Sequence, residues 1–169
     1  MKKTGLFILF LFLSAVTFAQ AAKEANLKAA FIYNFTRYID WNTGLGEGDF
    51  VIGIIGSSAI TNPLSAIAKT NTAKNRRIII KLFNKPEDIT RCNVLFIPKN
   101  STFSLTSILE QVGKGVLTVS EETGFASMGT ALNFIITNDK LKFEANLEAI
   151  SAAGLTASSQ LLKLAIIVD

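Results

Sequence analysis

The stretch Phe50-Val51-Ile52-Gly53-Ile54-Ile55 decides the fold, because it is a short apolar run without polar residues at alternate positions. A strand with one face in water alternates apolar and polar side chains, whereas this run has apolar side chains on both faces. The same kind of run returns at 78–83, 94–97 and 116–119. Strands buried on both faces form mainly parallel sheets with helices on each side, so the sequence predicts a three-layer α/β domain.

A first helix precedes these strands. Apolar residues at helical spacing predict that it covers about 23–39, and that one stripe of it packs on the sheet. We expect Asp40, Trp41 and the glycine-containing stretch 43–48 to end this helix in a loop. The stripe consists of Leu27, Ala30, Phe31, Phe35 and Tyr38.

Shorter helices are expected between and after the strands. The segments 62–69 and 104–112 fit between apolar runs. After residue 146, a helix over 147–151 can be stopped by Gly154, and Ser158 can cap a last helix. The apolar residues of that last helix are Leu161, Leu162 and Ala165.

The segments 131–137 and 140–145 predict an antiparallel hairpin in an otherwise parallel sheet. Asn138 and Asp139 between them tolerate the left-handed backbone of a two-residue turn. This turn pairs Thr137 with Lys140, Ile136 with Leu141, Ile135 with Lys142, Phe134 with Phe143, and Asn133 with Glu144. The expected core face holds Leu132, Phe134, Ile136, Leu141 and Phe143.

Residues 1–19 have the layout of a secretory signal peptide. Lys2 and Lys3 precede the apolar run 5–13, and small residues lead to Ala19. The apolar run is shorter than the ~20 residues of a membrane-spanning helix, so we expect cleavage after Ala19 and a periplasmic protein. The chain has 169 residues, of which 49% are hydrophobic, and residues 20–169 are expected to form one domain.

The charge of the chain does not indicate nucleic acid as a partner. Removing Lys2 and Lys3 leaves 15 of the 17 Lys and Arg residues against 13 Asp and Glu, so the formal net charge falls from +4 to +2. The remaining basic residues are scattered apart from Lys74, Arg76 and Arg77, and no aromatic residues alternate with them as a stacking surface would require.

The residue inventory excludes several kinds of enzyme. The chain has no histidine and one cysteine, so catalytic triads that use histidine and imidazole metal sites are excluded. No phosphate-binding loop is present, and the glycines around 53–56 lack the third glycine of a dinucleotide fingerprint. We therefore expect no cofactor and no metal. Cys92 cannot form an internal disulfide and is expected to be a free, half-buried structural thiol.

Carboxylates and a serine–lysine pair are the catalytic groups that remain. A pair of carboxylates can act on a sugar only if a cleft holds them at a suitable separation. Six of the 13 acidic residues fall in predicted loops or turns, where we interpret them as solvated surface charges: Asp49, Glu87, Asp88, Glu121, Glu122 and Asp139. Ser158 or Ser159 could share a helix with Lys163, but nothing in the sequence supplies an oxyanion site. We therefore predict that the chain is not an enzyme.

The sequence resembles the YfiR family of periplasmic regulatory proteins over essentially the whole predicted domain. The N-terminal part of the resemblance is KAAFIYNFTRYIDW at 28–41, and the central part is CNVLFI at 92–97. The C-terminal part comprises VLTVS at 116–120, GFA at 124–126, Gly129, NFI at 133–135, KFEAN at 142–146, AAGL at 152–155 and SSQLLKLA at 158–165.

This resemblance implies a periplasmic protein, often dimeric, that binds without chemistry. The best-known relative holds a membrane-bound diguanylate cyclase inactive by binding its periplasmic sensor part, which lowers cyclic di-GMP and limits biofilm formation. Relatives with disulfides carry several cysteines. Here Gly53 stands where the resemblance would place a partner for Cys92, so control by disulfide redox does not carry over.

The candidate binding residues fall in three places, each with a structural alternative. Arg37, Tyr38 and Trp41 could form a partner patch or close the edge of the core. Gly124 and Phe125 could line a ligand site, although a glycine turn with an anchoring phenylalanine is the commoner role. For Asn133, Glu144 and Asn146 we favour hydrogen bonding within the scaffold over ligand recognition.

Three functions are compatible with these observations. The first is a periplasmic regulator that binds an inner-membrane diguanylate cyclase or sensor histidine kinase. The second is a small-ligand sensor with a pocket near the hairpin and Gly124. The third is a carboxylate-dependent hydrolase. The type of protein encoded by the neighbouring gene would distinguish the first two.

Overall fold

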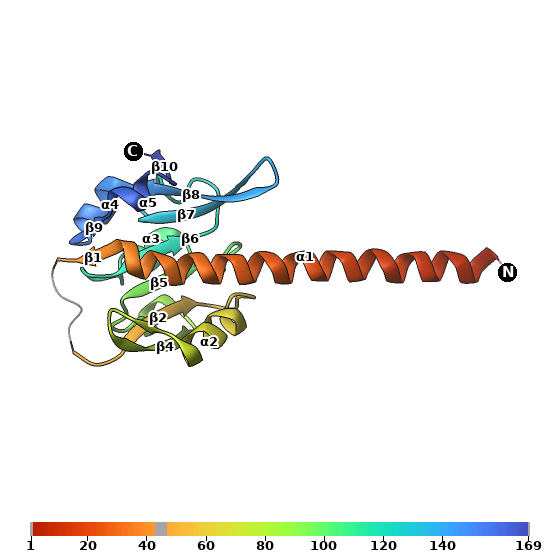
Figure 1. Ribbon diagram of the computed structural model, residues 1–169, viewed down its shortest axis with the longest axis horizontal. Coiled ribbons are helices and arrows are strands. Elements are labelled where there is room, and N and C mark those ends of the chain that lie inside the picture. Colours follow the sequence, from red (N-terminus) through yellow and green to blue (C-terminus); the bar gives the residue numbers. More distant parts are fainter. Residues whose placement is uncertain (1, 43–46, 169) are drawn as a thin grey trace.

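The computed structural model of the chain describes the backbone of residues 2–42 and 47–168, and the side chains of 20–42 and 47–168. Most of the predicted loop 43–48 lies outside the described residues. Eight strands form one sheet in the order β10-β8-β7-β6-β5-β2-β4-β3 (Figure 1). The strands are β2 (Phe50–Ile55), β3 (Thr72–Ala73), β4 (Arg76–Phe83), β5 (Val94–Ile97), β6 (Leu117–Ser120), β7 (Leu132–Thr137), β8 (Lys140–Asn146) and β10 (Ile166–Val168).

The sheet is mixed but mainly parallel, as predicted. The pairs β10–β8, β7–β6, β6–β5, β5–β2 and β2–β4 are parallel, and the pairs β7–β8 and β3–β4 are antiparallel. The chain runs from β2 to β4 on one side of β2 and then returns to β5 on its other side. The connections that leave the carboxyl ends of β2 and β5 therefore diverge, which marks the topological switch point of the sheet.

Helices cover both faces of the sheet and complete the three predicted layers. Long α1 and α2 lie on one face, where they contribute to the larger core cluster, and α3 lies on the other face with a smaller cluster. The alternation along β2 matches this division, since Phe50 and Ile52 belong to the first cluster and Ile55 to the second. The helices are α1 (Lys2–Tyr38), α2 (Thr61–Thr70), α3 (Leu105–Leu109), α4 (Leu147–Ala152) and α5 (Ser159–Leu162), with a 3-10 turn at Pro86–Asp88.

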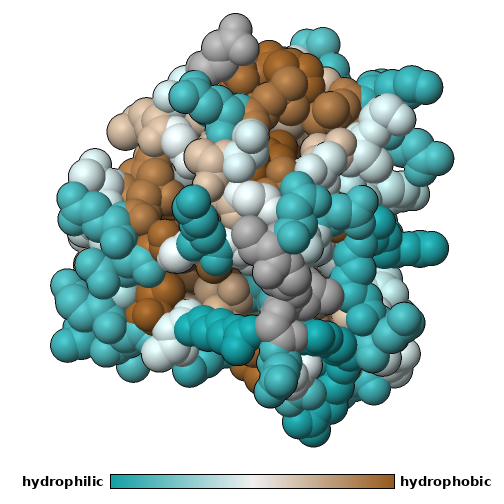
Figure 2. Space-filling model, turned by 90° about the vertical axis from the view of Figure 1, so that its left-hand side faces the viewer, coloured by the Kyte–Doolittle hydropathy of each residue, from teal (hydrophilic) through white to brown (hydrophobic). Residues whose placement is uncertain are grey.

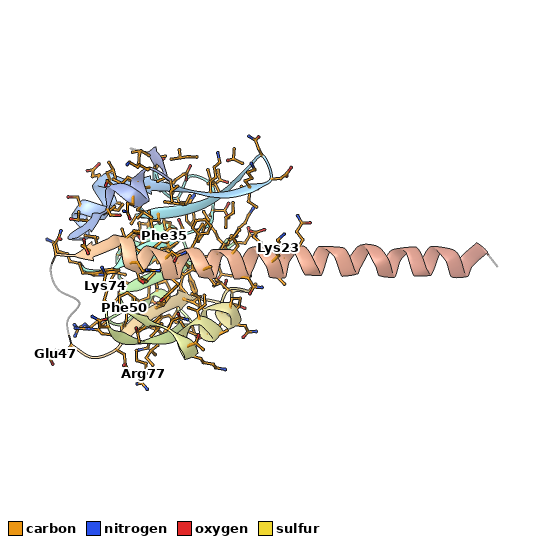
Figure 3. The ribbon with its side chains drawn as sticks, in the orientation of Figure 1. Lys23, Phe35, Glu47, Phe50, Lys74 and Arg77 are labelled. Carbon is orange, nitrogen blue, oxygen red and sulfur yellow. The ribbon has the colours of Figure 1, made fainter. Side chains whose placement is uncertain are left out.

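Aromatic packing attaches α1 to the sheet. The ring of Phe35, which is buried, stacks on Phe134 at 5.8 Å between centroids and meets Phe143 edge-on at 5.0 Å. Phe31 lies one turn earlier on the helix, 6.0 Å from Phe134. Figure 3 places Phe35 on the part of α1 that crosses the domain, and Figure 1 shows the helix continuing beyond it toward the N-terminus.

The first helix differs from its prediction at both ends. Its backbone is helical from Lys2, so it includes the segment that we assigned to the leader. At its other end, Asp40 and Trp41 do not start a loop but belong to β1 (Ile39–Trp41), which pairs with β9 (Leu155–Ala157) in a separate two-stranded sheet. Over residues 20–42 and 47–168, no helix has the length and apolar character needed to cross a bilayer.

The hairpin has the predicted register from Asn133–Glu144 to Thr137–Lys140. Asn138 and Asp139 have φ of 51° and 55°, as the two-residue turn requires. The predicted core face is wrong at Ile136, whose side chain is 60% exposed. The hairpin tip reaches past the rest of the sheet (Figure 1), so side-chain alternation points Ile136 to the predicted face, but an open groove between the hairpin and α1 leaves it exposed there.

The run 78–83 is also less buried than predicted. Ile78 and Phe83 are buried, but Lys81 and Leu82 are exposed. The strand lies next to the edge of the sheet and is flanked outward only by β3, which has two residues. Runs of apolar residues therefore identify this strand correctly but do not determine its distance from the sheet edge.

Gly53 creates the space in which Phe83 packs. A Cβ atom at Gly53 would lie 2.5 Å from Cε2 of Phe83 and 3.3 Å from Cδ1 of Leu95, and both side chains belong to the cluster under α3. A cysteine at this position would therefore displace Phe83. The packing of Phe83 thus requires glycine at the position where a disulfide partner for Cys92 would stand.

We predict that Gly53→Ala lowers the free energy of unfolding by about 1–3 kcal/mol, because the added methyl group overpacks the core. Urea denaturation would measure the loss, and the double variant Gly53→Ala, Phe83→Leu should recover part of it. Unchanged stability of Gly53→Ala would contradict this account of Phe83.

Candidate functional site

A buried polar network connects β6, β7 and β8 on the sheet face that lies away from α1. Nδ2 of Asn133 donates to Oε2 of Glu144 at 2.9 Å, and Ser120 Oγ donates to Oδ1 of Asn133 at 2.7 Å. Ser120 Oγ also lies 2.8 Å from Oγ1 of Thr130. Asn133, Ser120 and Thr130 are all fully buried. Asn133 thus has both ends of its amide occupied by the protein itself, which is the arrangement of a scaffold network.

Asn146, at the end of β8, bonds this strand to the loop before β7. Its Oδ1 accepts from the backbone N–H of Ala149 and caps α4, while its Nδ2 donates to the carbonyl of Ala126 at 2.9 Å. Asn133 bonds to Glu144 and to Ser120, whereas Asn146 bonds to Ala126 and Ala149. Asn146 therefore holds the loop that contains Gly124 and Phe125 against the hairpin.

Gly124 and Phe125 form a turn and its anchor. Gly124 has φ of +84°, a backbone conformation that glycine adopts without strain. Phe125 packs against the cluster under α3, and its carbonyl accepts from the N–H of Thr130 at 3.0 Å. The two residues lie beside the hairpin network, so the structure brings together two of the three predicted places.

The third place, at the end of α1, lies apart from them. Trp41 is nearly buried, its Nε1 donates to the carbonyl of Gly115 at 2.9 Å, and its ring meets Phe50 edge-on. Tyr38 packs partly buried against the larger cluster, whereas Arg37 is exposed. The aromatic residues therefore close the edge of the core, and Arg37 alone offers its side chain to solvent.

A group of paired charges at the carboxyl edge of the sheet was missed by the sequence analysis. Nζ of Lys28 on α1 bonds to Glu24 one turn earlier and lies 2.5 Å from Oε2 of Glu121, which follows β6. Oε1 of Glu121 accepts from the backbone N–H of Lys99 at 2.9 Å. Our interpretation of Glu121 as a solvated surface charge was wrong, since only 13% of its side chain is exposed.

These contacts raise the pKa of Lys28. Burial by itself lowers the pKa of an ammonium group, but hydrogen bonds and charge attraction from Glu121 and Glu24 outweigh it, so the pKa of Lys28 is raised. Lys28 therefore remains charged at physiological pH. It fixes the C-terminal half of α1 to the loop after β6.

A crevice of about 310 Å³ opens beside this ion pair, at the switch point between β2 and β5. Its walls are the β2–α2 connection, the residues after β5, and α1. The described side chains that offer polar atoms to it are Glu24, Lys28, Ser57, Ser58, Lys99 and Glu121. Gly124 does not line this crevice, and Phe125 beside it packs against the cluster under α3.

Exposed apolar side chains gather at two places on the C-terminal half of the domain. Leu164, Ile166 and Ile167 are exposed around β10, the edge strand of the sheet. Figure 2 shows apolar surface at the top of the molecule. Ile136 at the hairpin forms the second place, together with Leu27 of α1.

The chemistry available in the described residues is limited. No group of three or more His, Cys, Asp and Glu side chains in the described part of the chain could hold a metal ion. Ser158 accepts from the backbone N–H of Leu161 and caps α5, which uses its hydroxyl for structure. Burial raises the pKa of the Cys92 thiol to about 12, with a small opposing effect from Lys81, so this thiol is not a nucleophile.

The strand order and the helices on both faces define a single α/β domain with a mainly parallel mixed sheet. Its sequence matches the YfiR/HmsC-like family over residues 25–166, which includes almost all of the folded domain. The chain belongs to the YfiR/HmsC-like family. This family is associated with periplasmic regulation of cyclic di-GMP signalling and with an inner-membrane partner. None of the curated proteins compared with the chain is significantly similar in sequence.

We predict that Glu144→Ala lowers the free energy of unfolding by about 1–3 kcal/mol, because the buried amide of Asn133 loses its acceptor. Glu144→Gln keeps an acceptor oxygen and should recover most of this loss, while exposed Glu110→Ala should stay within about 0.5 kcal/mol of the wild type. Thermal unfolding measures all three. Normal stability of Glu144→Ala with lost partner binding would identify Glu144 as a binding residue instead.

Cys92 should not react in the folded protein. With a pKa of about 12, the thiolate is a negligible fraction at pH 8, so iodoacetamide should label Cys92 only after denaturation in urea. Cys92→Ser should cost roughly 1–2 kcal/mol through lost packing, and a reducing agent should leave the melting temperature unchanged. Rapid labelling of the native protein at pH 8 would refute this assignment.

Proposed function

We propose that this chain is an exported periplasmic regulator that binds and represses the periplasmic sensor part of an inner-membrane diguanylate cyclase. The observation that carries the proposal is the family match over 25–166, which includes every strand of the main sheet except the last residues of β10. Binding without chemistry is consistent with the hairpin, where the polar side chains bond to one another.

Export is part of this proposal. The layout of residues 1–19 supports a cleaved signal peptide, which would leave a mature protein beginning near Gln20. Among the described side chains of α1, the first that is buried is Ala25, so the proposed cleavage site lies before the part of α1 that joins the core.

Partner binding would rely on apolar surface. The exposed residues Leu164, Ile166, Ile167 and Ile136 are large apolar side chains of the kind that form the centre of protein interfaces. A homodimer would use the same kind of surface. A sensor histidine kinase with a periplasmic part remains the alternative partner, because the same contact would serve either signalling enzyme.

A ligand sensor is the second candidate function. The crevice of about 310 Å³ at the switch point supports it, because open α/β sheets bind ligands at this position and small-ligand pockets begin near this size. A neighbouring gene for a transporter or an outer-membrane receptor would favour this function. A rise in melting temperature with a small molecule, without any membrane partner, would distinguish it from the first.

The first proposal predicts a decrease in cyclic di-GMP. The exported full chain should be co-expressed with the membrane cyclase encoded beside its gene, and cyclic di-GMP measured by mass spectrometry should fall severalfold. The same cyclase without its periplasmic part is the control and should not respond. An equal fall with the truncated cyclase, or no fall with the intact one, would contradict the proposal.

A further inference from the structure

The crevice at the switch point contains polar groups that the protein does not use itself. Two of the charged side chains that line it, Lys28 and Glu121, are bonded to each other, and Oε1 of Glu121 also accepts from the backbone N–H of Lys99. Among the described residues, neither the ammonium group of Lys99 nor the hydroxyl group of Ser57 is bonded to another group. These two groups are therefore available to a bound molecule.

The available groups are hydrogen-bond donors. The ammonium group of Lys99 has three N–H donors and no acceptor. Oγ of Ser58 already accepts from the backbone N–H of Ile60 at 3.3 Å, which leaves its O–H to donate. Ser57 and Ser58 follow β2, and Lys99 follows β5, which pairs with β2. The donors thus stand at the carboxyl ends of two neighbouring strands, and a molecule that satisfies them must present acceptor atoms.

These donors belong to the body of the domain and not to the N-terminal end of α1. The two serines lie in the connection between β2 and α2, and Lys99 lies between β5 and α3. On the opposite wall, buried Ala25 and the bond from Lys28 to Glu121 hold α1 in place. All lining residues fall within 21–121, so both walls follow the proposed cleavage site in the chain.

We propose that this crevice binds a small soluble molecule through a carboxylate or phosphate group, an inference that rests on the second candidate function. Such a group accepts several hydrogen bonds at once, and a bond from a charged donor to an anion is stronger than a bond between neutral groups. The crevice volume of about 310 Å³ lies at the lower end for small-molecule sites, so the molecule is compact. In open α/β sheets, the switch point at the carboxyl edge is the usual position for such a ligand.

The carboxylate of Glu24 makes the affinity depend on the sign of the ligand's charge. Glu24 lines the α1 wall, where it bonds to Lys28, and its side chain is 36% exposed. Its negative charge opposes the binding of an anion, whereas the positive charge of Lys99 favours it. Removing one charge or the other should therefore change the affinity for an anion in opposite directions. The affinity for a cation would change with both signs reversed.

Binding is measured by NMR, with inorganic phosphate and succinate titrated separately into the purified exported chain labelled with nitrogen-15. At least one of these anions should produce saturable shifts of the backbone amide signals of Ser57, Ser58 and Lys99. Succinamide, a neutral analogue of succinate, should produce none. The anion that binds more tightly identifies the head group as a phosphate or a carboxylate.

The variants test the two charges with the anion that binds. Lys99→Met should weaken its binding at least about fivefold, and Glu24→Gln should strengthen it about two- to threefold. The matched controls are Lys140→Met at the hairpin and Glu110→Gln after α3, because both side chains are exposed and neither lines the crevice. The controls should change the affinity by less than about twofold. Melting temperatures establish that each variant is folded.

Stronger binding by Lys99→Met together with weaker binding by Glu24→Gln would overturn the assignment to an anion. Unchanged affinity of Lys99→Met, or an equal loss in Lys140→Met, would overturn the crevice as the site. The absence of saturable shifts with both anions would overturn the inference as well, while the second candidate function would still stand if a neutral molecule raised the melting temperature. None of these results affects the first proposal, which the cyclic di-GMP measurement tests separately.

Discussion

The need to bury the central strands on both faces governs the rest of this structure. The strands β2 and β5 carry apolar side chains toward α1 and toward α3, and neither face can be left in water. Covering the first face requires α1 to cross the sheet, and the stacking of Phe35 on Phe134 fixes where it crosses. The crevice at the switch point has α1 as a wall, so its position follows from this packing.

Hydrogen bonds and ion pairs then fix the relative positions of helices and strands that apolar packing alone leaves undetermined. Lys28 ties α1 to Glu121, and Glu121 in turn accepts from the backbone at Lys99, so one buried carboxylate links the helix to the ends of two strands. On the opposite face, Asn133 receives a hydrogen bond from Ser120 and donates one to Glu144. Each network is paired within the protein, which avoids the cost of leaving buried polar atoms without partners.

Local signals in the sequence were sufficient for the hairpin but not for the ion pair. Asn138 and Asp139 define a turn, and the turn alone sets the pairing of Asn133 with Glu144, because register propagates by simple alternation. Lys28 and Glu121 are 93 residues apart, and no local pattern indicates that a predicted loop will meet a predicted helix. The pairing depends on the position of α1, which only the assembled core determines.

Burial was predictable for the centre of the sheet and less so for its periphery. Alternation assigns Ile136 to the same face as Phe134, yet whether that face is covered depends on how far α1 and the hairpin run together. Likewise, the space at Gly53 that Phe83 fills belongs to a contact between two strands. A glycine in an apolar run indicates a close approach, but the sequence does not name the side chain that makes it.

The distribution of surface groups divides the molecule into two unlike halves. Around β3 and β4, exposed charges pair with each other, as Arg77 does with Asp49 at 2.8 Å, and that contact lowers the pKa of Asp49. Around β7, β8 and β10, the hairpin tip and the edge strand instead expose large apolar side chains, such as Ile136 and Ile167. Exposed ion pairs contribute little to stability or to recognition, whereas desolvating apolar surface is the main source of binding energy. Burying the surface of the hairpin half would therefore release more free energy than burying the surface around β3 and β4.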